Sequence, residues 1–233
     1  MPTDTAVVLV VAGTDSSGGA GIAADLDVLL EEGCAVRLAV TAVTAQTPTG
    51  VGAIAPIEAS VLRAQLDAAG PVDAVKVGML AGLEQVQTLV EWLSTLQPRP
   101  PVVVDPVLRS STGTALLSQE GAEALWKLWP LVALATPNHA EAEALSDGAG
   151  AEDWAGALPC PVLVTGGDLE GDEVIDLFFD GEEDPAELAH PRVDVNRRGT
   201  GCRLSSHIAA RMARGDEVED AVFGGIQAIV DWL

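Results

Sequence analysis

Continuous apolar runs alternate with helical patterns along most of the 233-residue chain. Residues 6–12 (AVVLVVA) are mostly β-branched, which is typical of a central strand in a parallel sheet. Further strands are predicted over residues 36–44, 74–77, 102–104, 131–135 and 162–165. Helical spacing of apolar residues predicts helices over residues 22–32, 58–69, 83–96, 120–129 and 139–145. This alternation predicts a single α/β domain over residues 1–233, with a mostly parallel sheet covered by helices on both faces.

The last third of the chain departs from this alternation. Residues 174–179 and 188–195 read as two strands around an acidic turn that contains proline, and we expect an antiparallel pair there. A helix led by glycines follows, and a last helix runs from about residue 217 to residue 232. Earlier in the chain, residues 46–52 read as a polar turn and residues 147–161 as poorly patterned chain with at most one weak helical turn.

The segment RRGTGCRLSSHIAARM (197–212) indicates an anion-binding helix N-terminus. Apolar residues recur every fourth position after the glycines, which predicts that the turn opens directly onto a helix. The first N–H groups of a helix lack intrahelical partners, and Gly199 and Gly201 allow close approach of a bulky anion. The window of residues 192–214 holds a single acid, Asp194, and six of the chain's 12 lysines and arginines: Arg192, Arg197, Arg198, Arg203, Arg211 and Arg214. A phosphate site is therefore predicted; the alternative is a glycine turn with arginines that balance acidic neighbours.

Several polar or glycine-rich loops follow predicted strands. They cover residues 13–21, 46–52, 105–114, 137–141 and 166–167. Ligands bind beyond the carboxyl ends of the strands in such sheets, so these loops are expected to share one site. A dinucleotide fingerprint is not supported, because six residues separate the first strand from Gly19 and no acid ends the second strand. No GxxxxGK[ST] phosphate loop occurs in the sequence.

Five side chains near these loops allow both a structural and a functional interpretation. Asp25 is either a helix-dipole acid or a group that faces a polar ligand. Asn138 and Glu141 have the spacing of a capping box, but their oxygens also suit a phosphate-bound Mg²⁺. Asp105, before Pro106, is either a turn acid or a ligand-facing carboxylate. Cys202, in the first turn of the anion-binding helix, is either a buried space-filler or a thiol whose pKa is lowered toward the thiolate.

Composition narrows the class of protein. The net charge of −23 disfavours nucleic acid as a partner, since a phosphate backbone requires a broad basic surface. Three scattered cysteines and the absence of a signal-peptide pattern predict a cytoplasmic location, and no apolar run predicts a membrane span.

Salt adaptation is expected from the balance of 35 acidic residues against only two lysines, Lys76 and Lys127. Ions screen the self-repulsion of an acidic surface, so the melting temperature should rise between low and molar KCl. An unchanged melting temperature in a thermal scan would contradict this expectation.

Seven ordered segments together resemble a known family. They are AGTDSSGGAGIAADL (12–26), VTAQTPTGV (43–51), VKVGML (75–80), VVVDPV (102–107), TPNHAEAEAL (136–145), VTGGD (164–168) and GTGCRLS (199–205). In order and spacing they are similar to the hydroxymethylpyrimidine/phosphomethylpyrimidine kinases of thiamine synthesis, in the ribokinase-like superfamily. The resemblance implies a three-layer α/β/α fold, a homodimer, and phosphorylation of 4-amino-5-hydroxymethyl-2-methylpyrimidine and its monophosphate with ATP and Mg²⁺.

The resemblance also implies roles for particular residues. The pyrimidine would be held by Gly13, Asp25, Gln46 and Met79. Mg²⁺ and the phosphates would be served by Asn138 and Glu141, and the ATP side by Asp105, Thr165, Gly167 and Arg198. An anion hole would be formed by Gly199, Thr200, Gly201 and Cys202. Cys202 would stand where related sugar kinases have an aspartate base, and would take the hydroxymethyl proton.

Some positions depart from the family's pattern. Thr165 and Ser111 stand where lysines are common, Arg198 stands where histidine is usual, and residues 146–160 form a shorter segment. We expect that Arg197, Arg198 and Arg203 compensate for the two missing cations. The departures leave two alternatives open, a pyridoxal or pyridoxine kinase and a catalytically silent pyrimidine-binding protein, with a nicotinamide oxidoreductase as a distant third.

Overall fold

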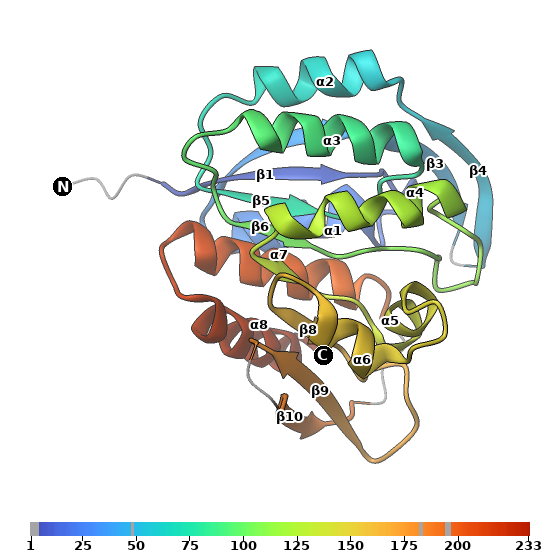
Figure 1. The fold of residues 1–233 in the computed structure, drawn as a ribbon, viewed down its shortest axis with the longest axis vertical. Helices are drawn as coiled ribbons and strands as arrows, with labels where there is room; N and C mark the ends of the chain where they lie inside the picture. Colours follow the sequence, from blue (N-terminus) through green and yellow to red (C-terminus); the bar gives the residue numbers. More distant parts are fainter. Residues whose placement is uncertain (1–4, 48, 182–183, 194–196) are drawn as a thin grey trace.

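The computed structural model describes residues 5–47, 49–181, 184–193 and 197–233. Its central sheet has eight strands in the order β10-β9-β8-β7-β6-β5-β1-β2 (Figure 1). The strands are β1 Val7–Ala12, β2 Ala35–Val40, β5 Ala74–Val77, β6 Val102–Val104, β7 Leu134–Ala135, β8 Val162–Val164, β9 Glu173–Phe179 and β10 Ala186–Pro191. The six strands from β2 to β8 are parallel, whereas β9 and β10 are antiparallel to their neighbours, as the sequence predicts.

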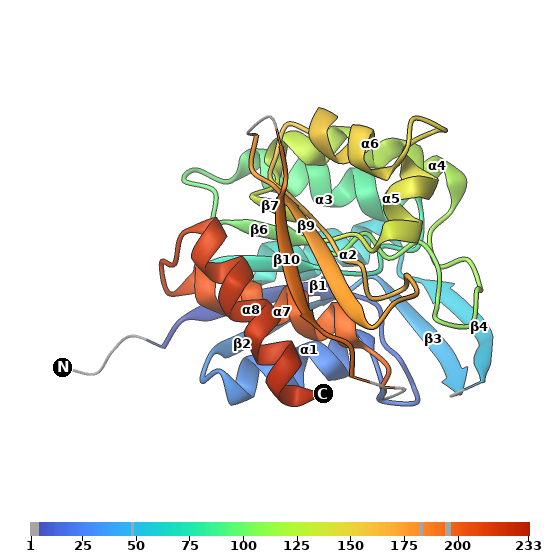
Figure 2. The same ribbon diagram turned by 90° about the horizontal axis from the view of Figure 1, so that it is seen from below.

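Helices cover both faces of this sheet, so the predicted three-layer arrangement is confirmed. The helices are α1 Gly21–Glu31, α2 Ala59–Ala68, α3 Leu83–Thr95, α4 Gln119–Ala124, α5 His139–Leu145, α6 Ala151–Ala157, α7 Thr200–Ala213 and α8 Val218–Trp232. Leu9 and Val11 of β1 face the layer that contains α2 and α3, and Val8 and Val10 face α1, α7 and α8. Figure 1 shows α2 and α3 above the sheet and α7 and α8 below it, and Figure 2 views the lower layer.

A separate two-stranded sheet corrects the prediction for residues 36–52. The predicted strand 36–44 is divided at Thr41, whose N–H donates to the carbonyl of Ala12 (3.0 Å) and whose hydroxyl donates to that of Met79 (2.5 Å). Beyond this break, β3 Ala42–Thr47 and β4 Gly50–Pro56 form an antiparallel hairpin at the end of the main sheet (Figure 1). The segment read as a polar turn is therefore mostly strand, because cross-strand pairing overrides the low strand propensity of its glycines.

Two helical segments also differ from the prediction. The helix expected over residues 120–129 is α4 followed by two 3₁₀ turns, Leu125–Lys127 and Trp129–Leu131, and the following strand shortens to β7. The segment read as poorly patterned contains α6, which Trp154 anchors by packing edge-to-face on Trp129 at 5.9 Å between ring centres. Part of the strand expected over residues 188–195 lies outside the described residues. None of the described helices has the length and apolarity needed to span a bilayer.

Candidate active site

A cleft lies beyond the carboxyl ends of the parallel strands. Gly13 follows β1, Met79 follows β5, Asp105 follows β6 and Thr165 follows β8, as the rule for open α/β sheets predicts. The N-terminus of α7 and the strand β3 add the remaining walls. Most of the predicted site residues line this cleft: Gly13, Gln46, Met79, Asp105, Asn138, Glu141, Thr165, Arg198, Gly199, Thr200, Gly201 and Cys202.

The first turn of α7 forms the predicted anion-binding feature. Gly199 caps the helix with a left-handed backbone (φ 78°), and a methyl group there would overlap the carbonyl oxygen of Gly19. Gly201 is open toward the cleft, and a methyl group there would lie 3.6 Å from Oδ2 of Asp105. Gly199 is needed for the close approach of the 13–21 loop, and Gly201 leaves the cleft side of the turn uncovered. The free N–H groups of this turn point into the cleft with the positive end of the helix dipole.

Cys202 occupies the cleft wall as a protonated thiol. Burial raises the pKa of Cys202 to about 12, and Lys76 only partly opposes this effect. The expectation of a lowered thiol pKa at this helix N-terminus is therefore wrong, because desolvation outweighs the helix dipole. The thiol lies near the carboxyl of Asp105, and burial raises the pKa of that carboxyl to about 6 although Lys76 and Cys202 oppose the rise.

Asp25 is placed behind the cleft wall, away from the pyrimidine-facing position that the resemblance implies. Its Oδ1 lies 2.9 Å from Nζ of Lys76 and accepts a hydrogen bond of 2.9 Å from the hydroxyl of Ser206. The side chains of Asp25 and Lys76 are both fully buried. Asp25 thus fixes the lysine from behind, and Lys76 reaches the cleft floor.

Lys76 is a functional candidate that the sequence analysis missed. Although burial alone would lower it, the pKa of Lys76 is raised because the carboxylates of Asp25 and Asp105 lie beside its ammonium. The lysine therefore remains charged beneath the first turn of α7. A signal was present in the sequence: one of only two lysines in the chain stands in the middle of a buried apolar strand.

Asn138 and Glu141 form the predicted capping box at the start of α5. Asn138 Oδ1 accepts from the Glu141 N–H (2.8 Å), and Glu141 Oε2 accepts from the Asn138 N–H (3.1 Å). Burial, followed by repulsion from Asp105, raises the pKa of Glu141 to about 8. Two buried carboxyl groups that repel each other fit a divalent cation that keeps several waters and binds substrate phosphates. Among the described residues, no group of three or more His, Cys, Asp or Glu side chains could hold a metal ion.

A second hollow adjoins the cleft and holds Gly167. It lies beside β9, β10 and the end of α8, and shares Thr165, Thr200 and Gly201 with the cleft. Arg192 orders the loop that forms its edge by donating to the carbonyls of Gly167 (3.0 Å), Leu169 (2.6 Å) and Gly171 (2.8 Å). Two connected compartments are suitable for two substrates.

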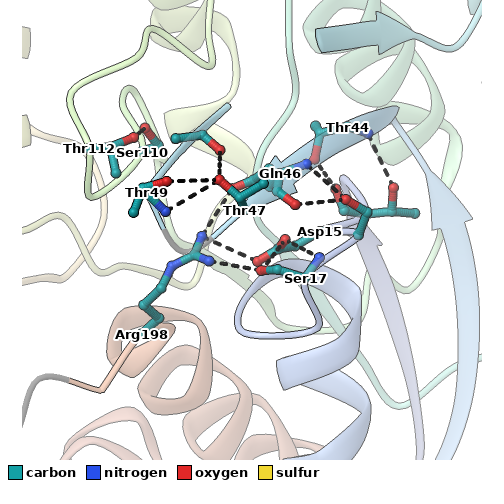
Figure 3. Close-up of polar contacts among 12 residues, drawn as sticks. Asp15, Ser17, Thr44, Gln46, Thr47, Thr49, Ser110, Thr112 and Arg198 are labelled. Atoms are coloured by element: carbon teal, nitrogen blue, oxygen red, sulfur yellow. Dashed lines mark hydrogen bonds and ion pairs between the residues drawn. The ribbon is translucent and has the colours of Figure 1, made fainter. Parts of the chain in front are cut away.

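The arginines expected to compensate for missing lysines are mostly engaged elsewhere. Arg197 and Arg203 stack on the Trp232 ring at 4.6 and 4.5 Å, and Arg203 also pairs with Asp27 (2.8 Å). Arg198 points away from the second hollow toward the 13–21 loop (Figure 3). Arg197 still lines the second hollow, so only that arginine retains a position suited to the expected compensation.

Solved structures with this architecture are small-molecule kinases. An ADP complex of Bacillus subtilis pyridoxal kinase superposes with a TM-score of 0.85 at 32% identity, covering 96% of this chain and 90% of the other. Phosphomethylpyrimidine kinase from Clostridium difficile 630 gives 0.81 at 33% identity, with 98% and 99% covered. The fold and the cleft thus define a kinase of the ribokinase-like class, as predicted.

The sequence comparisons specify the family. A family model described as phosphomethylpyrimidine kinase matches residues 15–231, and the chain belongs to this family. It is similar to the hydroxymethylpyrimidine/phosphomethylpyrimidine kinases of Rhizobium meliloti (40% identical, 94% of this chain and 86% of the relative) and Streptomyces coelicolor (41%, 95% and 86%). The match covers only 44% of a thiamine biosynthetic bifunctional enzyme from Arabidopsis thaliana.

Proposed function

We propose that this chain transfers the γ-phosphoryl group of ATP to the hydroxymethyl group of 4-amino-5-hydroxymethyl-2-methylpyrimidine, and then to its monophosphate. One observation carries the proposal: the anion-binding turn of α7, with Cys202 and Asp105, opens into the same cleft as Gln46 and Met79. Relatives named for this activity, 40–41% identical over most of the chain, support the choice of substrate.

The pyrimidine ring would lie between an apolar and a polar wall. The thioether of Met79 lies against Gly13, where a methyl group would come within 2.9 Å of the sulfur, so this wall is shaped by the glycine. Gln46 supplies an amide for the ring's amine and nitrogen. This placement directs the hydroxymethyl group toward Cys202 and the first turn of α7.

The reaction would need little covalent help from the protein, because phosphoryl transfer relies mainly on positioning and charge stabilisation. The hydroxymethyl oxygen attacks phosphorus as the bond to ADP breaks. Its proton would pass to Sγ of Cys202 while the thiol proton passes to the neighbouring carboxylate of Asp105. The N–H groups of Gly199–Cys202 and the ammonium of Lys76 stabilise the negative charge.

The second hollow would hold ATP, with Thr165 and Gly167 near its phosphates. Asn138 and Glu141 would hold the Mg²⁺, which supplies neutralisation of the phosphate charge when bound. We further propose a cytoplasmic homodimer. The exposed apolar side chains of Leu38 on the edge strand β2 and Val43 on β3 support the dimer, which light scattering would test.

Pyridoxal phosphorylation is a second candidate activity. Structures of Staphylococcus aureus pyridoxal kinase superpose with a TM-score of 0.86 at 27% identity, covering 97% of this chain and 87% of the other. The same cleft could therefore admit a six-membered nitrogen ring with a hydroxymethyl group.

A coupled assay of ADP release separates these functions. The hydroxymethylpyrimidine and pyridoxal are compared with Mg·ATP at low and molar KCl. We expect rapid turnover of the pyrimidine and slow or no turnover of pyridoxal. Preferential turnover of pyridoxal would favour the second candidate. Stabilisation of the protein by the pyrimidine in a thermal-shift assay, without ADP release at either salt concentration, would identify a silent binding protein.

A further inference from the structure

The guanidinium of Arg198 joins three segments that are far apart in sequence (Figure 3). Nη1 donates to the hydroxyl of Ser17 (2.8 Å), and Nη2 donates to Oε1 of Gln46 (3.0 Å). Nη2 also lies 3.3 Å from Oδ2 of Asp15, a buried carboxylate whose other oxygen accepts from Ser17. The residue before the anion-binding turn therefore ties the 13–21 loop to the hairpin strand β3.

This contact fixes which way round the side-chain amide of Gln46 lies. Arg198 has only donors, so it must face the amide oxygen. On the other side, Nε2 of Gln46 lies 2.9 Å from the hydroxyl of Thr44, which already donates its proton to the carbonyl of Thr14 (2.6 Å). That hydroxyl can only accept, so it must face the amide nitrogen. Both neighbours select the same orientation and exclude the flipped one.

The main chain of Gln46 is held as firmly as its side chain. Its N–H donates to the hydroxyl of Ser16 (2.8 Å), and that hydroxyl lies 3.1 Å from the Gln46 carbonyl. Arg198 and Gln46 both line the cleft. With Arg198 and Thr44 satisfied, the amide keeps one lone pair and one N–H for a ligand. An amine next to a ring nitrogen offers the complementary donor and acceptor.

We propose that Arg198 is a positioning residue that sets specificity for an aminopyrimidine by locking the orientation of the Gln46 amide. Asp15 holds the guanidinium in place, and the guanidinium holds Gln46. A pyridine ring without an amine beside its nitrogen cannot use both free groups of this amide. The inference rests on the proposed function for the identity of the ring.

A double-mutant cycle tests the proposal. The variants are Arg198→Met, Gln46→Ala and their combination. Arg63→Met is a matched control, because Arg63 pairs with Asp67 on the exposed surface of α2, away from the cleft. Arg198→Met should raise the KM for the pyrimidine about 10–100-fold, the effect of losing hydrogen bonds to a charged group. The KM for ATP should stay close to the wild-type value. The melting temperature should fall, because the buried carboxylate of Asp15 loses its counter-charge. The double variant should be no worse than Gln46→Ala alone, since both changes remove one interaction.

Three results would overturn the inference. The first is a double variant whose increase in the KM for the pyrimidine is the product of the two single increases. The second is an Arg198→Met variant that raises the KM for ATP and not that for the pyrimidine, and the third is an equal loss of pyridoxal and pyrimidine turnover in that variant. Failure of the proposed function is distinguishable, because it would appear in the wild-type protein as absence of pyrimidine turnover. In that case the affinity of the wild-type protein and of the three variants for the pyrimidine is measured by isothermal titration calorimetry. Non-additive losses of affinity would then support the role of Arg198, and additive losses would refute it.

Discussion

Replacement of Cys202 by alanine is expected to lower kcat for the pyrimidine about 10²–10⁴-fold, the usual contribution of a positioned proton acceptor. The thiol lies in the cleft wall near Asp105, so its loss interrupts the proposed path of the hydroxymethyl proton. The KM for ATP should change little, because the nucleotide compartment lies on the other side of the anion-binding turn. Steady-state kinetics with both substrates varied would measure these effects.

Cys160 offers a matched control for this substitution. Burial raises the pKa of Cys160 to about 12, as it does for Cys202, but Cys160 lies in the core beside α6 and β8. Cys160→Ala should therefore retain the kcat of the wild-type protein. If Cys202→Ala also retained it, the thiol would be only a packing group and the proton would need another acceptor.

Lys76→Met is expected to lower the free energy of unfolding by about 3–5 kcal/mol, the usual cost of breaking a buried ion pair. The lysine lies 2.9 Å from Asp25 with both side chains fully buried, so its removal leaves a carboxylate without a counter-charge. Urea unfolding followed by circular dichroism would measure the loss.

The double variant Lys76→Met/Asp25→Asn separates this cause from poor packing. It removes both charges together, so most of the lost stability should return. Its kcat should remain low, because Lys76 also faces Asp105 and Cys202 beneath the anion-binding turn. A double variant as unstable as Lys76→Met would show that methionine simply does not fit, and full recovery of kcat would assign the lysine to stability alone.

The sequence predicted the parallel core of the fold because those strands are buried on both faces. Runs such as residues 6–12 and 102–104 have few polar residues, so their pattern is unambiguous. The hairpin β3–β4 and the short helix α6 were missed for a common reason. Their stability comes from tertiary contacts, such as the packing of Trp154 on Trp129, and not from a local pattern.

The sequence predicted which loops form the site, but it did not predict the directions in which their side chains point. The rule for strand ends placed Asp105 and Gln46 in one site, and the family resemblance added the first turn of α7, as found. Side-chain direction required the structure: Asp25 faces Lys76 instead of the cleft, and Arg198 faces Gln46 instead of the nucleotide compartment. Burial also could not be quantified from sequence, and this quantity reverses the expected direction of the Cys202 pKa shift.

The packing of α7 on the sheet has a consequence for folding. This late helix covers Val8 and Val10 at the start of the chain, and Arg198 contacts Ser17, 181 positions earlier. During synthesis, α1 can cover only part of this apolar face of the first strand until nearly the whole chain is available. Contacts of such long sequence separation are formed slowly. The anion-binding turn and the pyrimidine wall should accordingly be completed together, in the last step of folding, and an unfinished chain should be prone to aggregation through the face that α7 leaves open.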